Sequence, residues 1–226
     1  MYESRSKRTT WVWFVLIVII SVLMWTVVLS TGTKNNLHLS EEPKDVRAYF
    51  PVFPGLIYDF GGEGMEFAPF TRYVKFADDP YVQMHDANGT VVARVFECLP
   101  HEIRLVQIEP EFYEDVSLIG SASEQKEELA VILQTPLDVG HVWAETADRY
   151  REITAVDKVI TVPAGTFHDV IEIKITSRES GAETYTYEYY AKNIGLIKRM
   201  FIADIDDEEY IVSSYLEHLS SSGLQP

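Results

Sequence analysis

Cysteine is nearly absent from this chain of 226 residues, because Cys98 is the only one. A single cysteine cannot form an intrachain disulfide, so the compartment of the protein cannot be inferred from cysteine pairing. Cys98 lies in the mainly apolar stretch Val95-Phe96-Glu97-Cys98-Leu99. We therefore expect a buried, structural thiol there.

Basic residues are also few: 19 Lys and Arg stand against 35 Asp and Glu, giving a formal net charge of −16. A body this negative repels the phosphate backbone of nucleic acids. No run of Lys or Arg interleaved with aromatic residues offsets that repulsion. The charge balance argues against nucleic-acid binding and favours cationic partners or metal ions.

The common catalytic signatures are missing. The sequence has no Gly-x-Ser-x-Gly elbow, no Gly-x-Gly-x-x-Gly, no phosphate-binding Gly-Lys-Ser/Thr loop and no His-Glu-x-x-His. No two of the six histidines have the short spacing that places two imidazoles on one metal ion. We predict a protein that is not an enzyme and that has no catalytic residues, metal site or cofactor. An envelope hydrolase is the least favoured alternative and would need His141, His168 and an acidic residue to converge.

One long hydrophobic run is present, from Trp11 to Leu29. At about 1.5 Å per residue, a helix of this length is close to what is needed to cross the hydrocarbon core. Trp11, Trp13 and Trp25 lie near its ends, as expected of membrane-interface anchors, and the basic residues of the N-terminus precede it. The run predicts a single-pass membrane protein with its N-terminus in the cytoplasm.

The domain organisation follows from this segment. We expect a basic cytoplasmic tail (1–10), a transmembrane helix (11–30), a polar stalk (31–48), an extracytoplasmic β domain (49–219) and a disordered tail (220–226). A cleaved signal peptide is the alternative for the hydrophobic run, although its apolar core exceeds the usual length of about 7 to 15 residues.

The remainder of the chain alternates apolar and polar residues in short runs, which is typical of antiparallel strands with one buried face. Asn88-Gly89 is the strongest local signal and predicts a tight hairpin turn. We expect loop around Ser121-Ala122-Ser123, no confident helix outside the membrane, and at most a helical turn or two over 145–150. The predicted strands are 81–87, 90–99, 101–109, 127–134, 151–162, 167–177, 183–191, 196–203 and 209–216.

Four segments carry a resemblance to known proteins. They are Tyr49-Phe50-Pro51, Gly140-His141-Val142-Trp143, Thr161–Phe167 and Tyr189–Arg199. Together they resemble uncharacterised membrane-attached or secreted bacterial proteins of the TapB-like and LolA-like groups, over roughly residues 49 to 216. The resemblance implies a mainly β fold in which a curved antiparallel sheet forms a half barrel or an open barrel meander.

Two functions are open for such a domain. The favoured one is a non-enzymatic binding or interaction role at the cell envelope, with an envelope protein as partner. The alternative is a carrier or sensor that holds a lipid or other apolar ligand in the concavity of the sheet. Tyr185, Tyr187 and Tyr189 share one face of a predicted strand and are the candidate ligand-binding residues, although cross-strand packing also explains them.

Overall fold

Antiparallel hairpins build the domain. The computed structural model describes residues 45–125, 128–177, 184–205 and 208–222, all within one unit of residues 42–226. Two short helices are present in this part, the 3-10 helix η1 (Val46–Tyr49) and α2 (Ile119–Gln125). The strands are β1 (Leu56–Glu63), β2 (Phe70–Asp78), β3 (Tyr81–Asn88), β4 (Thr90–Cys98), β5 (Glu102–Glu109), β6 (Ala130–Gln134), β7 (Val142–Ala144), β8 (Arg149–Val162), β9 (Gly165–Ser177), β10 (Thr184–Ala191), β11 (Gly195–Ile205) and β12 (Glu208–Ser221).

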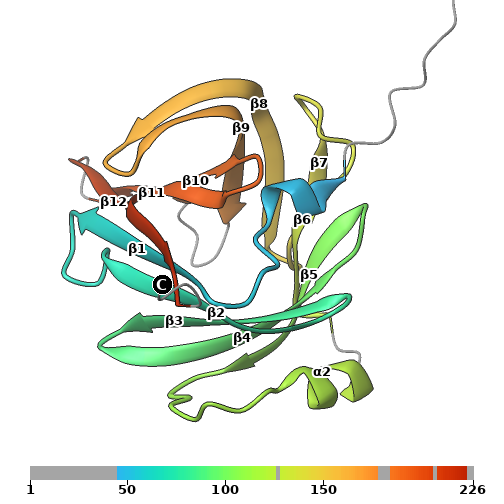
Figure 1. Cartoon of the computed structure of the whole chain (residues 1–226). Coiled ribbons are helices and arrows are strands. Elements are labelled where there is room, and N and C mark those ends of the chain that lie inside the picture. The colour runs from blue at the N-terminus through green and yellow to red at the C-terminus, as the bar shows by residue number, and fades with distance from the viewer. Residues whose placement is uncertain (1–44, 126–127, 178–183, 206–207, 223–226) are drawn as a thin grey trace, which may run out of the picture. The chain divides into compact units, whose positions relative to one another are not determined.

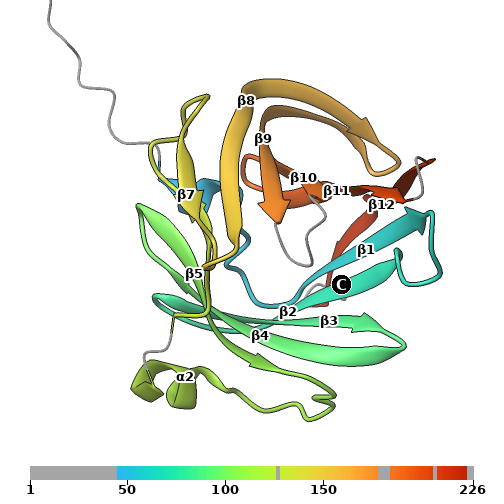
Figure 2. The ribbon, with the colours of Figure 1, turned by 180° about the vertical axis from the view of Figure 1, so that it is seen from behind.

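The strands form one sheet that curls into a nearly closed barrel (Figures 1 and 2). Its order is β6-β5-β4-β3-β2-β1-β12-β11-β10-β9-β8-β7, so the first and last strands pair in the middle of the sheet. The two edge strands β6 and β7 then meet. The Val131 N–H donates to the Glu145 carbonyl at 3.3 Å, and the Trp143 indole N–H donates to the Val131 carbonyl at 3.0 Å. The mainly β, antiparallel prediction is confirmed, and the sheet is more closed than a half barrel.

Irregular pairing bends the longest hairpin over one side of the barrel. The β8–β9 pair changes register three times, between residues 153 and 160, and Asp157 and Asp169 adopt positive φ angles of 54° and 51°. Such bulges increase strand twist and curvature. The hairpin therefore arches across the top of the barrel in Figure 1.

The interior is filled by the apolar face of the strands and by the segment that precedes β1. Ile171, Ile173 and Ile175 are all buried, as their alternation predicts. Val46 and Phe50 are buried as well, and the Val46 N–H donates to the Pro100 carbonyl at 3.1 Å. Figure 1 shows this segment crossing inside the ring of strands. Helix η1 thus lies across the expected boundary between the stalk and the β domain.

A second, smaller cluster lies on the outer face. Val95 and Val106 of the sheet pack against Ile119 and Ala122 of α2. The loop expected around residues 121–123 is therefore wrong, because α2 gains apolar contacts with the sheet that its sequence does not show. The helical turns considered for residues 145–150 are also absent, since residues 145–148 form the bend that joins β7 to β8 and β8 begins at Arg149.

A buried hydrogen-bond network holds the segment before α2 against β3. Gln83 accepts a hydrogen bond from the Leu118 N–H at 2.7 Å, and its amide nitrogen donates to the Val116 carbonyl at 3.1 Å. The same nitrogen lies 2.8 Å from Nε2 of His85. Because the amide nitrogen can only donate, Nε2 accepts and the His85 ring is neutral.

Every strand predicted from the sequence is present, with β12 extending to Ser221, and the structure adds β1, β2 and β7. In β1 the pair Gly61-Gly62 interrupts the apolar alternation, because a Cβ on Gly62 would lie 2.4 Å from the backbone of Ala68. The predicted membrane segment, with Trp11, Trp13 and Trp25, lies outside the described residues. Within the described ranges, no helix has the length and apolar character needed to cross a bilayer.

Candidate functional site: the arginine cavity

A cavity of about 370 Å³ lies inside the barrel. Its walls come from the N-terminal segment and from strands on opposite sides of the sheet, and we call it the arginine cavity. Its charged lining consists of five arginines and three carboxylates: Arg72, Arg94, Arg149, Arg151, Arg199, Asp86, Glu145 and Glu188. Half of the ten arginines of the chain therefore surround one internal space.

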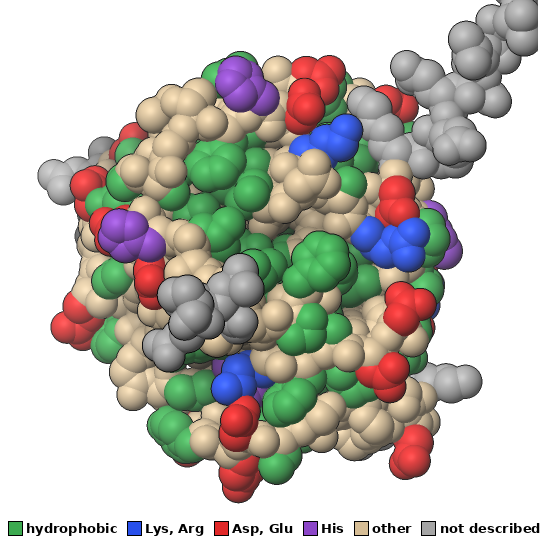
Figure 3. Space-filling view, viewed as in Figure 1, with side chains coloured by type: hydrophobic (Ala, Val, Ile, Leu, Met, Phe, Trp, Pro, Cys, Tyr) green, Lys and Arg blue, Asp and Glu red, His purple; other side chains and the backbone are tan. Residues whose placement is uncertain are grey.

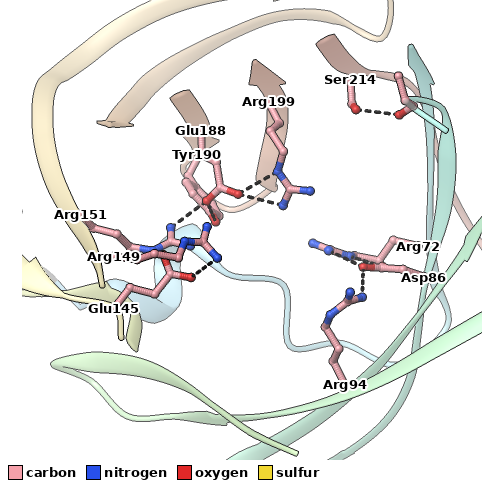
Figure 4. Close-up of polar contacts among 11 residues, drawn as sticks. Arg72, Asp86, Arg94, Glu145, Arg149, Arg151, Glu188, Tyr190, Arg199 and Ser214 are labelled. Carbon is pink, nitrogen blue, oxygen red and sulfur yellow. Dashed lines mark hydrogen bonds and ion pairs between the residues drawn. The ribbon is translucent and has the colours of Figure 1, made fainter. Parts of the chain in front are cut away.

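Asp86 holds two arginines on one wall of the cavity (Figure 4). Arg72 on β2 lies directly opposite Asp86 on β3 and donates to both carboxylate oxygens, at 2.7 and 2.8 Å. Arg94 on β4 donates to one of the same oxygens at 2.6 Å. One carboxylate thus bridges two guanidiniums.

Glu188 and Glu145 form the opposite wall. Glu188 on β10 lies opposite Arg199 on β11, which donates to it at 2.8 Å. Its other oxygen accepts from Arg151 at 2.8 Å and from the Tyr190 hydroxyl at 2.7 Å. Arg151 also donates to Glu145 at 2.9 Å. Arg151 is therefore held by two carboxylates at once.

A fifth arginine completes this wall and shows the pattern of the site. Arg149 lies 3.5 Å from Glu145, which already binds Arg151. Each carboxylate is thus shared between a deep arginine, Arg72 or Arg151, and an outer one. The deep side chains are 11% and 4% exposed, whereas the outer ones retain more accessible surface: Arg94 30%, Arg149 36% and Arg199 39%.

The electrostatic environment keeps Glu188 and Asp86 charged. Burial would raise the pKa of Glu188, but Arg151 and Arg199 outweigh it and lower that pKa. Burial would likewise raise the pKa of Asp86, and Arg72 and Arg94 again bring it below the ordinary value. The cavity therefore contains fixed charges and has an excess of two positive ones.

The pKa of Arg94 reflects this excess of positive charge. Burial lowers its pKa, Asp86 opposes the effect, and the positive charges of Arg72 and Arg199 lower the pKa further. The influence of Arg199 reaches Arg94 from the opposite wall, so the two clusters interact across the cavity. Figure 4 shows the open space between them.

The chain as a whole has the opposite charge. On the face shown in Figure 3, Asp and Glu side chains lie mainly around the edge, and apolar side chains occupy much of the middle. The formal charge of the whole chain is −16. The positive interior is thus a local feature and does not reflect the overall composition.

A larger cavity of about 510 Å³ lies beside the N-terminal segment. Most of its lining is apolar, and its only arginine, Arg47, is paired with Asp45. Phe50 lines both cavities and packs edge-to-face on Phe96 at 5.0 Å between ring centres. Because buried charged side chains from both sides of the sheet converge on the arginine cavity, we place the candidate site there.

Comparisons with known proteins identify no family. No protein-family model and no curated protein sequence matches the chain. An exported-protein candidate with a YmcC-like fold from Bacteroides fragilis is 16% identical, with a TM-score of 0.44, and 76% of this chain aligns with 98% of that one. A lipoprotein candidate from Parabacteroides distasonis is 18% identical, with a TM-score of 0.48, over 80% and 100% of the two chains. Likenesses at this level carry no argument about ligand, partner or location, and the specific TapB-like and LolA-like resemblance finds no support in them.

The predicted ligand-binding tyrosines lie on the other face of β10. Tyr185, Tyr187 and Tyr189 are half-buried and alternate with Thr186, Glu188 and Tyr190, which line the cavity. Lys174 lies 3.9 Å from the ring centre of Tyr185, and Lys158 lies 5.5 Å from that of Tyr189. These cation–π contacts support the packing explanation. A ligand-binding role for the three tyrosines stays a prediction.

The histidines named for a hydrolase do not line the arginine cavity. His141 stacks on Trp143 with ring centres 5.4 Å apart, and His168 is exposed. In the described part of the chain, no group of three His, Cys, Asp or Glu side chains could hold a metal ion. Cys98 is buried as predicted, and burial raises its pKa to about 12.

Sequence reasoning missed the cavity residues, although a signal for them exists. Four of the arginines lie two residues from a buried apolar side chain on the same strand, and so share its face. The pairs are Arg72 with Val74, Arg94 with Phe96, Arg151 with Ile153 and Arg199 with Ile197. An arginine on the buried face of several strands indicates a charged interior.

Proposed function

We propose that the protein binds a small anionic molecule inside the barrel, in a role that is binding and not catalysis. One observation carries the proposal: five arginines and three carboxylates converge on a cavity of about 370 Å³ in an acidic chain. A volume of this size falls in the usual range for small-molecule sites, about 300 to 1,000 Å³.

The protonation states support binding over catalysis. A general acid or base works best with a pKa near the operating pH. Among the described residues that line the cavity, none is His, Cys or Lys. The pKa of Glu188 is lowered, and burial together with Glu188 raises that of Tyr190, so both move away from neutrality.

The same charges modify the carrier alternative. A wholly apolar ligand would strip water from Arg94, Arg149 and Arg199 without replacing their hydrogen bonds, which is costly. A ligand that fills this cavity should therefore carry negative charge. We further propose that binding takes place outside the cytoplasm, on the basis of the hydrophobic run Trp11–Leu29.

Isothermal titration of the full-length chain in a non-ionic detergent tests the binding role, with phenyl phosphate and phenyl sulfate as probes. We expect saturable binding of at least one probe, weakened about tenfold or more by Arg199→Gln. A hydrogen bond to a charged group contributes about 1.5–3 kcal/mol, and about 1.4 kcal/mol is tenfold in affinity.

Arg104→Gln is the matched control. Arg104 on β5 also pairs with carboxylates, Glu97 and Glu128, and it does not line the cavity. This variant should bind the probe as the wild type does. Absence of binding by the wild type, or equal weakening in both variants, would contradict the proposed function.

A further inference from the structure

The number and arrangement of charges in the arginine cavity restrict the ligand further. Every carboxylate on the wall is already shared by two guanidiniums, so the pairs within the protein leave two positive charges uncompensated. Burying unpaired charge is unfavourable, and a bound anion of matching charge offsets it.

The three outer arginines have donors available for such an anion. A guanidinium carries five N–H groups. Among the described residues, Arg94 uses one terminal nitrogen, on Asp86, and Arg199 uses two nitrogens, both on Glu188. Arg149 makes one long contact of 3.5 Å. The remaining donors lie on side chains that face the space between the clusters in Figure 4.

The deep arginines hold the outer ones in place. Arg72 and Arg151 fix the carboxylates to which Arg94, Arg149 and Arg199 bind. The donors are therefore positioned before a ligand arrives, which lowers the entropic cost of binding.

Apart from Thr186 and Tyr190, the rest of the lining is apolar and comes from both sides of the barrel. Six side chains form it: Phe50, Phe96, Leu105, Ile108, Ile132 and Ile175. A fully hydrated inorganic anion would leave these surfaces in contact with water. An anion that carries an apolar group covers them and gains about 25 cal/mol per Å² of apolar surface removed from water.

We infer that the ligand is a dianion attached to an apolar group, of the chemical type represented by a phosphate monoester. This inference rests on the proposed function. Two negative charges match the excess of the cavity, and three oxygens on one atom can accept from guanidiniums on both walls at once.

The test compares three probes on the full-length chain by isothermal titration at pH 7.5. Phenyl phosphate is a dianion at this pH, phenyl sulfate has the same shape with one charge less, and inorganic phosphate lacks the apolar ring. We expect phenyl phosphate to bind at least about tenfold more tightly than phenyl sulfate, the effect of one charged interaction. It should also bind more tightly than inorganic phosphate, because its ring covers the apolar lining.

Variants that remove one positive charge sharpen the test. Arg149→Gln breaks only the long contact with Glu145 and should perturb the fold little, while Arg199→Gln removes a tighter pair. In both variants we expect phenyl phosphate affinity to fall more than phenyl sulfate affinity, so that their difference shrinks. Arg104→Gln should leave the difference unchanged.

The outcomes separate the two levels of the argument. Equal or tighter binding of phenyl sulfate in the wild type overturns the dianion and leaves the anion site in place. Inorganic phosphate binding as tightly as phenyl phosphate overturns the apolar group. Failure of all three probes overturns the proposed function, and the inference with it.

Discussion

Glu188 is the carboxylate that joins Arg151 and Arg199 in one ion-pair cluster of the arginine cavity. Its two oxygens accept from Arg151, Arg199 and Tyr190, and it is almost fully buried. Glu188→Gln removes the negative charge and leaves Arg199 without a carboxylate. Removing one partner of a buried ion pair costs about 3–5 kcal/mol. Gln keeps an oxygen that accepts hydrogen bonds, so we expect a loss of about 3 kcal/mol in the free energy of unfolding.

Urea denaturation at pH 7, followed by far-UV circular dichroism, measures this loss. For a chain of this size, about 3 kcal/mol corresponds to a decrease of roughly 6–12 °C in Tm. Glu172→Gln is the matched control, because Glu172 is on the neighbouring strand β9 and pairs with Lys158 on the outer face. Its loss should be about 1 kcal/mol or less. A Glu188→Gln loss no greater than that of the control would refute the role assigned to the cluster.

Two further expectations concern pH and the membrane. Burial and the Lys75 ammonium lower the pKa of His85 below its ordinary value of 6.5 despite the opposing Asp115 and Asp86 carboxylates. As the pH drops, the His85 ring therefore binds a proton more readily in the unfolded chain than in the folded one, which destabilises the folded state. Urea midpoints should fall as the pH drops from 7.5 to 5.5. The decrease in urea midpoint should be smaller in His85→Gln. An equal decrease in this variant and the wild type would contradict the role assigned to His85. The hydrophobic run Trp11–Leu29 should keep the full-length chain in the membrane fraction during carbonate extraction, and release into the supernatant would exclude the anchor.

The strands were predictable because side-chain alternation is a local property. Ile171, Ile173 and Ile175 mark one face of β9 whatever the rest of the chain does, and Asn88-Gly89 marks the turn between β3 and β4. Elements that are stabilised by contacts between distant parts of the chain were harder to predict from the sequence. The helix α2 depends on Val95 and Val106 of the sheet, and β1 contains glycines that only their close neighbours explain.

Strand β10 of the candidate site also shows what local sequence cannot decide. Alternation separates Tyr185, Tyr187 and Tyr189 from Glu188 and Tyr190, but it does not say which set faces the interior. From the sequence, a row of three tyrosines is a stronger candidate for a ligand-binding surface than a single glutamate. Burial of Ile173 opposite Glu188 in the paired strand β9 places the glutamate inside.

By itself the sequence determined the strand content and the hydrophobic run near the N-terminus, because each depends on residues close together in the chain. It also determined the acidic overall charge, which is a sum over all residues wherever they lie. The tertiary structure decided where the charges meet. Arg72, Asp86 and Arg94 lie more than fifty residues from Glu145, Glu188 and Arg199, and the curled sheet brings both groups to one cavity. Closure makes one face of every strand an interior, and only then do five arginines become a site.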